Sequence, residues 1–430
     1  MTAPLALPID LTGWLTYIEA QHPKSIAMGL DRVNEVKQRL KLNPVFPIIT
    51  VAGTNGKGST CAMLERIYHE AGYRVAGYSS PHLLRYNERV RIGCMEASDS
   101  ALCDAFLAVE AARGEILLTY FEFGTLAAMW HFMQSDIDVA ILEVGMGGRL
   151  DAVNAFNPAC AIVTSIDLDH MEFLGNSREA IGYEKAGVFR PDTPAICGDV
   201  DPPSTLVQHA ASIDADLMLV GRDFEFRLTG DSWTFCHGKT EIGYLPLPAL
   251  VGDFQLTNAA CVIAAIEVMQ QLLPVTPTAM ATGLRTTTLA GRFQLYPSRP
   301  QVILDVAHNP HAASALAGNL RKLPCHGRTL VVFAMLVNKD IAGVVAAVSK
   351  EVDSWYVASI HNARGANAQQ LADLIQLQAP DGDIRRFADV TSAYLQACMD
   401  ASENDRIVVF GSFFTVADVM RVLTQDIDDD

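Results

Sequence analysis

The sequence lacks the features of several protein classes. No apolar run approaches the ~20 residues that a membrane-spanning helix needs, and residues 1–23 contain neither a basic segment nor a long apolar core. The nine cysteines include no Cys-x-x-Cys pair, which argues against a disulfide framework or a zinc ribbon. No Lys/Arg cluster occurs and the formal net charge is −17, which disfavours nucleic-acid binding. We therefore expect a cytoplasmic protein with no membrane or nucleic-acid partner.

The order of apolar segments predicts an α/β protein with two domains. Residues 138–144 and 159–165 are strongly apolar strands separated by helical patterns, which is typical of a mostly parallel sheet covered on both faces. Residues 223–244 suggest a small antiparallel excursion. The alternation restarts near residues 286–291, so we expect domains at 1–288 and 289–430, the second one smaller.

Start signals place several helices. Asn176 with Glu179 three residues later predicts a helix over 177–188, and Asn309 followed by Pro310 predicts another. Apolar periodicity adds helices at 11–21, 30–42, 98–113, 121–134 and 257–273.

Residues 48–60 read Ile-Ile-Thr-Val-Ala-Gly-Thr-Asn-Gly-Lys-Gly-Ser-Thr, the order strand, glycine-rich loop, helix. Such a loop turns backbone N–H groups toward a polyphosphate, Lys57 adds a positive charge, and the helix points its positive end at the same place. Only two residues separate Gly53 from Gly56, which is shorter than the usual nucleotide loop. We predict ATP or GTP binding; a glycine-rich surface turn is the alternative.

Polar residues at strand ends are the next candidates, because ligands of open α/β sheets bind there. Glu143 ends an apolar strand, where a carboxylate is costly unless paired, protonated or metal-bound, and Mg²⁺ is its natural partner beside a phosphate loop. Satisfaction by loop amides is the alternative. His170 follows the next strand, and residues 78–82 offer hydroxyls and an imidazole at the same edge. A structural histidine and a simple turn are the corresponding alternatives.

Three further groups come from later in the chain. Lys185 lies on a predicted helix, where a lone lysine is usually solvated. Asp305 and His308 flank the end of a strand in the second domain, and Arg292 lies in the linker. These residues suggest a nucleotide held between the domains, with capping of the following turn as the alternative for Asp305.

Seven motifs in order, spread between about residues 25 and 415, resemble the folylpolyglutamate synthase/dihydrofolate synthase family of the Mur ligase superfamily. The motifs are Gly-Thr-Asn-Gly-Lys-Gly-Ser (53–59), Tyr-Ser-Ser-Pro-His (78–82), Glu-Val-Gly-Met-Gly-Gly-Arg-Leu-Asp-Ala (143–152), Asp-His (169–170), Glu-Lys-Ala-Gly (184–187), Gly-Arg-Phe (291–293) and Asp-Val-Ala-His-Asn-Pro-His (305–311). The short loop spacing is the form that this superfamily uses.

The resemblance implies an N-terminal P-loop ATPase domain, a Rossmann-like C-terminal domain and an ATP-dependent ligation of L-glutamate to a pterin carboxylate. Its implied nucleotide-binding residues are Thr54, Asn55, Gly56, Lys57, Gly58, Ser59, Asn258, Arg292 and Asp305. The implied Mg²⁺ ligands are Ser80, Glu143 and His170, and Lys185 resembles a lysine that this family carbamylates. The candidate catalytic residues are Lys57, Lys185, Arg292 and His308.

The resemblance also implies a pterin pocket. Its segments are Ser25, Ile26 and Ala27; Thr119, Tyr120, Phe121 and Glu122; and Leu150, Asp151 and Ala152. Phe121 is placed to stack on the ring, and Ala27 stands where the family pattern has an acidic residue.

The predicted reaction begins with phosphorylation of the pteroate carboxylate by ATP, and the glutamate amine then displaces phosphate. We expect 7,8-dihydropteroate, reduced folates, L-glutamate and ATP as small-molecule partners and a monomeric enzyme. Another Mur-type ligase, a nucleotide-hydrolysing switch protein and a non-catalytic relative are the alternatives. The roughly 47 residues before the first strand are too few for the nucleotide-sugar domain of other Mur-type ligases.

Overall fold

The computed structural model describes residues 7–24, 26–380 and 382–428, with side chains to residue 425. Contacts divide the chain into two compact units, Met1–Ala249 with Thr257–Thr287 and Leu250–Leu256 with Thr288–Asp430. This boundary precedes the predicted one by one residue. The sequence pattern did not indicate that residues 250–256 belong with the second unit.

The first unit is built on a mixed sheet in the order β4-β3-β2-β5-β1-β6-β7-β8. Its strands are β1 Ile48–Ala52, β2 Val75–Tyr78, β3 Val90–Ile92, β4 Met95–Glu96, β5 Val139–Glu143, β6 Cys160–Val163, β7 Pro194–Cys197 and β8 Asp216–Leu219. Only the β2–β3 and β3–β4 pairs are antiparallel. Every residue of β1 and β5 is buried, so both faces of the central sheet are covered.

The register of the central strands places the site. Val51 of β1 pairs with Glu143 of β5, and Ala52 pairs with Val163 of β6. The carboxyl ends of these three parallel strands therefore lie together at one edge of the sheet, and the loops that follow them begin there.

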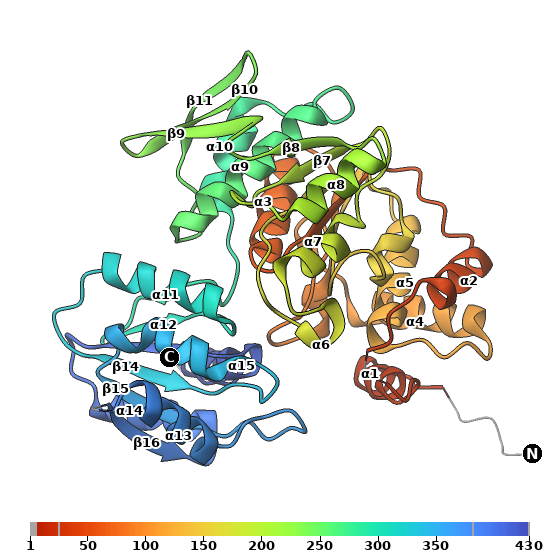
Figure 1. The fold of residues 1–430 in the computed structure, drawn as a ribbon. Coiled ribbons are helices and arrows are strands. Elements are labelled where there is room, and N and C mark those ends of the chain that lie inside the picture. The colour runs from red at the N-terminus through yellow and green to blue at the C-terminus, as the bar shows by residue number, and fades with distance from the viewer. Residues whose placement is uncertain (1–6, 25, 381, 429–430) are drawn as a thin grey trace, which may run out of the picture. The chain divides into compact units, whose positions relative to one another are not determined.

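Helices and a small second sheet complete the first unit. The helices are α1 Leu11–Glu19, α2 Asp31–Arg39, α3 Lys57–Glu70, α4 Asp99–Arg113, α5 Tyr120–Met133, α6 Met171–Leu174, α7 Arg178–Ala186, α8 Ser204–Ser212, α9 Asp253–Val268 and α10 Pro277–Thr286. The part of α9 before Thr257 belongs to the second unit. The predicted antiparallel excursion is confirmed as β9 Phe224–Thr229, β10 Ser232–His237 and β11 Thr240–Pro246, and β11 contacts α10 (Figure 1).

The second unit has a sheet in the order β12-β13-β17-β14-β15-β16, in which only β12 is antiparallel to its neighbour. The strands are β12 Gln294–Tyr296, β13 Gln301–Leu304, β14 Thr329–Phe333, β15 Ser354–Ala358, β16 Asp383–Phe387 and β17 Arg406–Phe410. The helices are α11 Pro310–Lys322, α12 Ile341–Val348, α13 Ala368–Gln378, α14 Val390–Asp400 and α15 Phe413–Asp428. Asn309 caps α11 by accepting from Ala312 N, as predicted.

Several predicted boundaries are wrong. Ser177, rather than Asn176, caps α7 by accepting from Ala180 N. Helix α9 begins at Asp253 and ends at Val268, whereas periodicity predicted 257–273; the residues after Val268 continue as turns. The sequence pattern also missed β16, because its charged residues do not read as a strand of a buried sheet.

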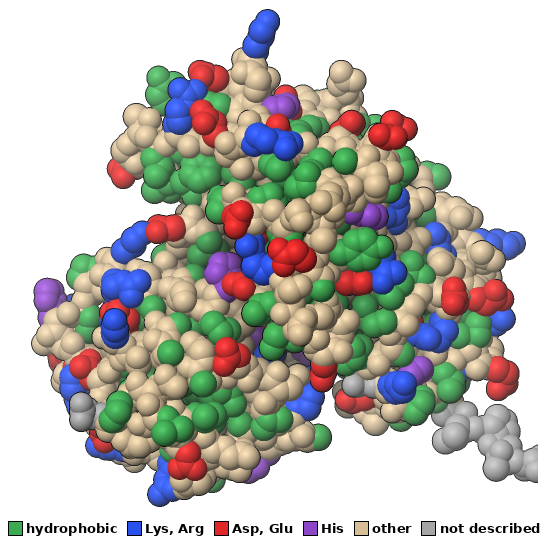
Figure 2. Space-filling view, viewed as in Figure 1, with side chains coloured by type: hydrophobic (Ala, Val, Ile, Leu, Met, Phe, Trp, Pro, Cys, Tyr) green, Lys and Arg blue, Asp and Glu red, His purple; other side chains and the backbone are tan. Residues whose placement is uncertain are grey.

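Charge on the surface is mixed in sign. On the face shown in Figure 2, basic and acidic side chains of the described residues are interspersed. Within the described part of the chain, no helix has the length and hydropathy that a membrane crossing requires.

Candidate active site

The loop after β1 depends on two closely packed glycines. Gly53 has a φ of +148°, and a Cβ added there would lie 1.9 Å from Thr164 Oγ1. Gly56 has a φ of +88°, and its added Cβ would lie 2.6 Å from Asn258 Oδ1. Side chains at these positions would collide with packed neighbours as well as strain the backbone. The short loop is therefore packed against its surroundings and differs from an isolated surface turn.

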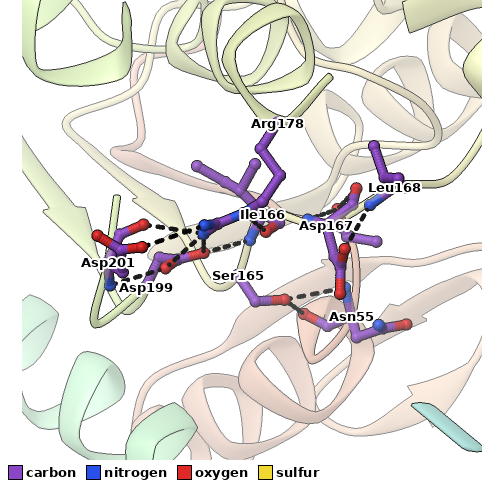
Figure 3. A network of polar contacts seen from close by, with 9 residues as sticks. Asn55, Ser165, Ile166, Asp167, Leu168, Arg178, Asp199 and Asp201 are labelled. Carbon is purple, nitrogen blue, oxygen red and sulfur yellow. Dashed lines mark hydrogen bonds and ion pairs between the residues drawn. The ribbon is translucent and has the colours of Figure 1, made fainter. Parts of the chain in front are cut away.

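The segment after β6 holds the tip of this loop (Figure 3). Thr54 N donates to Ser165 O at 2.7 Å. The Thr54 hydroxyl donates to Asp167 O at 3.1 Å, and Asp167 N donates to the same hydroxyl at 3.0 Å. Asn55 N donates to Ser165 Oγ at 3.2 Å. The predicted phosphate loop is thus fixed by the strand-end loop that leads to His170.

Helix α3 begins at Lys57, directly after the loop, rather than near residue 59. Gly58 and Ser59 consequently lie in its first turn, where backbone N–H groups point out of the helix end. Lys57 Nζ donates to Gly53 O at 3.0 Å and to Thr54 O at 3.2 Å. The ammonium group therefore lies over the loop, where the resemblance expects phosphate.

Glu143 has the predicted strand-end position and is only 4% exposed. Its Oε2 accepts a hydrogen bond from Ser80 N at 3.1 Å. Two of the three predicted metal ligands are thus neighbours, and the amide contact expected by the alternative interpretation is also present. A buried carboxylate is an oxygen ligand of the kind that a hard cation prefers, so the position of Glu143 beside Ser80 fits such an ion.

His170 stands immediately before α6 in the left-handed region, with a φ of +51°. The backbone N–H of His170 donates to Asp169 Oδ1 at 2.8 Å, and the ring Nε2 lies 3.9 Å from Asp169 Oδ2. Within the described residues, no group of three or more His, Cys, Asp and Glu side chains is arranged to hold a metal. Of the three predicted Mg²⁺ ligands, only Glu143 and His170 belong to these residue types, and the third is Ser80.

Lys185 is buried, contrary to the solvated position expected of a lone helical lysine. It lies in the last turn of α7 with 3% exposure. Burial and, to a smaller extent, the charge of Lys57 lower the pKa of Lys185 to about 7, against the opposing effects of Asp169 and Asp151. The fold therefore brings both predicted catalytic lysines of the first unit into one electrostatic cluster with two carboxyl groups.

The segment at 119–122 has a structural role that the resemblance did not indicate. Thr119 and Glu122 form a capping box at the start of α5, and both are 4% exposed. Glu122 also forms an ion pair with Arg32 at 2.7 Å, while Arg32 Nη2 donates to Ala27 O at 2.6 Å. These contacts bring the 119–122 segment to the 26–32 segment. Ser25 lies outside the described residues.

The third predicted pterin segment adjoins the same region. Gly29 N donates to Leu150 O at 3.5 Å, and a Cβ at Gly145 would lie 2.7 Å from Phe121 Cζ. Asp151 accepts from Met146 N at 2.9 Å, which closes the loop after β5.

Asp151 and Ala152 are themselves buried. Asp151 also accepts from Val153 N at 3.0 Å, and burial raises its pKa to about 7 although the backbone donors oppose the change. The structure thus brings together the described residues of all three segments that are predicted to bind pterin, with Tyr120 at the start of α5. It gives the polar side chains of Thr119, Glu122 and Asp151 internal partners as well.

The second unit holds its predicted residues around the start of α11. Asp305 accepts from Phe293 N at 2.9 Å and Ala307 N at 2.8 Å, so it braces both the linker and the following turn. Burial raises the pKa of Asp305, while the charge of Arg292 opposes that change. The Arg292 guanidinium lies 5.2 Å from the Phe413 ring centre, and His308 Nδ1 lies 2.8 Å from Val306 O.

Sequence reasoning missed three residues around this site. Asp199 follows β7, so the strand-end rule would have found it. Arg178 is the first residue of α7 and Arg32 lies in the first turn of α2, where nothing in the local pattern distinguishes a solvated arginine from a partly buried one that donates hydrogen bonds.

Comparisons with known proteins agree along the chain. Residues 51–266 match the Mur ligase middle domain, and residues 291–413 match the Mur ligase, glutamate ligase domain. The chain is 46% identical to the dihydrofolate synthase/folylpolyglutamate synthase of Escherichia coli strain K12, over 96% of this chain and 95% of that protein.

Solved structures match as closely. The structure of E. coli FolC in complex with DHPP and ADP has a TM-score of 0.93 and 45% identity, covering 98% of this chain and 99% of that one. A bifunctional folylpolyglutamate synthase/dihydrofolate synthase with Mn, AMPPNP and L-glutamate bound has a TM-score of 0.91 and 44% identity, covering 98% of this chain and all of that one (100%).

Proposed function

Because the chain belongs to the Mur ligase family, and within it to the dihydrofolate synthase/folylpolyglutamate synthases, we infer that it is an ATP-dependent ligase. It joins L-glutamate to 7,8-dihydropteroate and extends the glutamate chain of reduced folates. The predicted family, α/β fold and enzyme class are confirmed. The observation that carries the function is the pairing of Val51 with Glu143, which puts the nucleotide loop and a buried carboxylate at one sheet edge.

The reaction requires no covalent enzyme intermediate. An oxygen of the substrate carboxylate attacks the γ-phosphorus of ATP, and the bond to the β-phosphate oxygen breaks to give ADP and an acyl phosphate. The glutamate amine then attacks the acyl carbon, phosphate leaves, and the amine loses a proton. Lys57 offsets the negative charge on the transferring phosphoryl group, and the loop holds that group in position.

We propose Mg²⁺ as the divalent ion, held by Ser80, Glu143 and His170. The buried Glu143 carboxylate beside Ser80 is the observation that fits this ion. When bound, Mg²⁺ would neutralise phosphate charge. The relative with Mn and AMPPNP bound supports divalent-metal and nucleotide use in the same fold.

We also propose that Lys185 is carbamylated. A buried amine whose pKa is about 7 is largely neutral near physiological pH, and only the neutral amine adds to CO₂. The product is an anion, so its charge complements Lys57 nearby. This modification would place a further carboxylate-like oxygen pair next to the phosphate loop.

The remaining residue roles are proposals of the same kind. Phe121 stacks on the pterin ring. Only a glycine at residue 145 leaves room for the Phe121 side chain, because an added Cβ would collide with its ring. Asn258, which belongs to the first unit, binds nucleotide, as do Arg292 and Asp305 of the second unit. His308 assists transfer of the acyl group to the glutamate amine. We propose that the enzyme acts as a monomer in the cytoplasm; light scattering at assay concentration tests the first point.

The decisive experiment measures ADP release with Mg²⁺-ATP and L-glutamate. Dihydropteroate and tetrahydrofolate should each stimulate release and yield a product heavier by one glutamyl residue. Release that is equally fast without any pterin would refute ligation and favour the nucleotide-hydrolysing switch protein. A nucleotide-linked sugar acid that replaces the pterin would indicate another Mur-type ligase.

A further inference from the structure

Ile166 lies between the two residues that hold the nucleotide loop. Ser165 accepts from Thr54 N, and Asp167 exchanges two hydrogen bonds with the Thr54 hydroxyl. Ile166 itself makes none of these contacts. Its backbone N–H and carbonyl group are bound from the other side of the segment (Figure 3).

One ion pair binds both backbone groups of Ile166. Asp199 Oδ2 accepts from Ile166 N at 2.8 Å, and Arg178 Nε donates to Ile166 O at 2.9 Å. Arg178 Nη2 donates to the two carboxylate oxygens of Asp199 at 3.0 and 3.1 Å. Three residues from α7, the segment after β6 and the segment after β7 therefore form one closed set of contacts.

Neighbouring contacts fix the ion pair itself. Asp201 N donates to Asp199 Oδ1 at 3.0 Å, and Asp201 O accepts from Arg178 Nη2 at 2.8 Å. Asp199 is only 9% exposed, so its charge is largely shielded from water. Hydrogen bonds to charged groups are stronger than neutral ones, and partial burial increases their effect. The segment between β6 and α6 is consequently held more firmly than a loop with neutral contacts alone.

We propose that Arg178 and Asp199 are positioning residues that set the nucleotide loop through the backbone of Ile166, so that affinity for adenine nucleotide depends on an ion pair outside the nucleotide contacts. The chain of contacts runs from the ion pair to Ile166, from its neighbours Ser165 and Asp167 to Thr54, and from Thr54 to the phosphates. This inference rests on the proposed ATP-binding role of the loop.

Two variants test the proposal. Arg178→Met keeps a long unbranched side chain but removes every donor, and Asp199→Asn keeps the shape and one acceptor while removing the charge. We expect Arg178→Met to raise the Kd for ADP and the KM for ATP about tenfold. Asp199→Asn should raise the Kd for ADP and the KM for ATP by a smaller factor. The KM values for dihydropteroate and L-glutamate should stay within about twofold of wild type, since no contact of this set leads to the pterin segments.

A matched control separates positioning from general stability. Arg113 of α4 is 7% exposed and donates to Glu110, Gly114 O and Ile116 O, none of which belongs to the loop. Arg113→Met should lower Tm but leave the Kd for ADP unchanged. A purely structural role for Arg178 would reduce the active fraction, and therefore kcat, without changing the Kd.

A double-mutant cycle tests whether Arg178 affects nucleotide binding through Thr54. If Arg178 acts through Thr54, the effects of Arg178→Met and Thr54→Val on the Kd for ADP should be strongly non-additive. A folded Arg178→Met protein with wild-type Kd for ADP, or strictly additive effects, would overturn the proposal. A wild-type protein that binds ADP but does not ligate glutamate would refute the proposed ligase function alone, because the binding measurement needs no turnover.

Discussion

Replacement of Lys185 by methionine should abolish ligation while making the folded protein more stable below pH 7. The side chain is 3% exposed, and burial lowers its pKa from 10.5 to about 7. One pKa unit is equivalent to about 1.36 kcal/mol, so the buried ammonium form is disfavoured by about 5 kcal/mol. Methionine has a similar length and needs no protonated form, which removes this cost.

The sign of the pH dependence follows from proton binding. Between pH 7 and 10.5 the unfolded protein binds more protons at this position than the folded protein. The contribution of Lys185 to the free energy of unfolding therefore rises with pH across this window, and the full penalty is present below pH 7. In CO₂-free buffer, the stability difference between Lys185→Met and wild type should be largest near pH 6 and shrink toward pH 10.

Burial of Lys185 also determines the fraction of its amine that is neutral and therefore reactive. At pH 7 about half of the Lys185 side chains are neutral, against roughly one in 3,000 for a lysine with the ordinary pKa. Enzyme depleted of CO₂ should lose activity and regain it when bicarbonate is added, and ¹³C-labelled CO₂ should give a carbamate NMR signal that Lys185→Met lacks. Lys37→Met is the control, because Lys37 also has a pKa lowered by burial and by Arg190 but donates to Ala155 O.

Full activity after thorough CO₂ depletion would refute carbamylation. Wild-type turnover by Lys185→Met would refute any catalytic role. A stability difference that does not vary with pH would show that the buried amine is solvated in a way that the contacts above do not describe.

Three other changes test the nucleotide loop and its neighbour. Lys57→Ala should reduce turnover by about two to three orders of magnitude in a folded protein, because phosphoryl charge loses its cation; a normal ligation rate would show that the loop assignment is wrong. Glu143→Ala should raise the Mg²⁺ concentration needed for half-maximal activity, and an unchanged Mg²⁺ titration would rule out its role as a ligand. Gly53→Ala should destabilise the fold by about 1–3 kcal/mol and abolish ADP binding, since its Cβ would meet Thr164 Oγ1 at 1.9 Å. Gly72→Ala is its control, having a φ of +93° but open space around the added Cβ, and equal effects of the two variants would contradict the packing argument.

Predictions of buried strands succeeded because their apolar pattern was strong. Continuous apolar runs predicted strands at 138–144 and 159–165, and the structure has β5 and β6 there with ends that differ by at most two residues. The pattern missed β3, β4 and β16, which lie at or next to a sheet edge, because these strands carry charged or exposed side chains and their pairing is decided by neighbours that are distant in sequence.

Prediction of the site followed the same division. Strand-end reasoning located Glu143 and the loop after β6, because the carboxyl ends of parallel strands share an edge whatever the residues between them. It could not show that Lys185 is buried, since a lysine on a short helix reads the same whether its side chain faces solvent or core. It also could not show that Glu122 forms an ion pair with Arg32, which is distant in the chain.

The sequence by itself determined the order of strand, loop and helix at residues 48–60, the α/β class and the family, because these depend on local pattern and on motifs in chain order. Tertiary structure alone decided the register of Val51 with Glu143, the depressed pKa of Lys185 and the contact of the loop with the segment after β6. These properties depend on distances and burial between residues that are far apart in the chain. The nucleotide loop is therefore readable from sequence, whereas the arrangement that holds it in place is visible only in the fold.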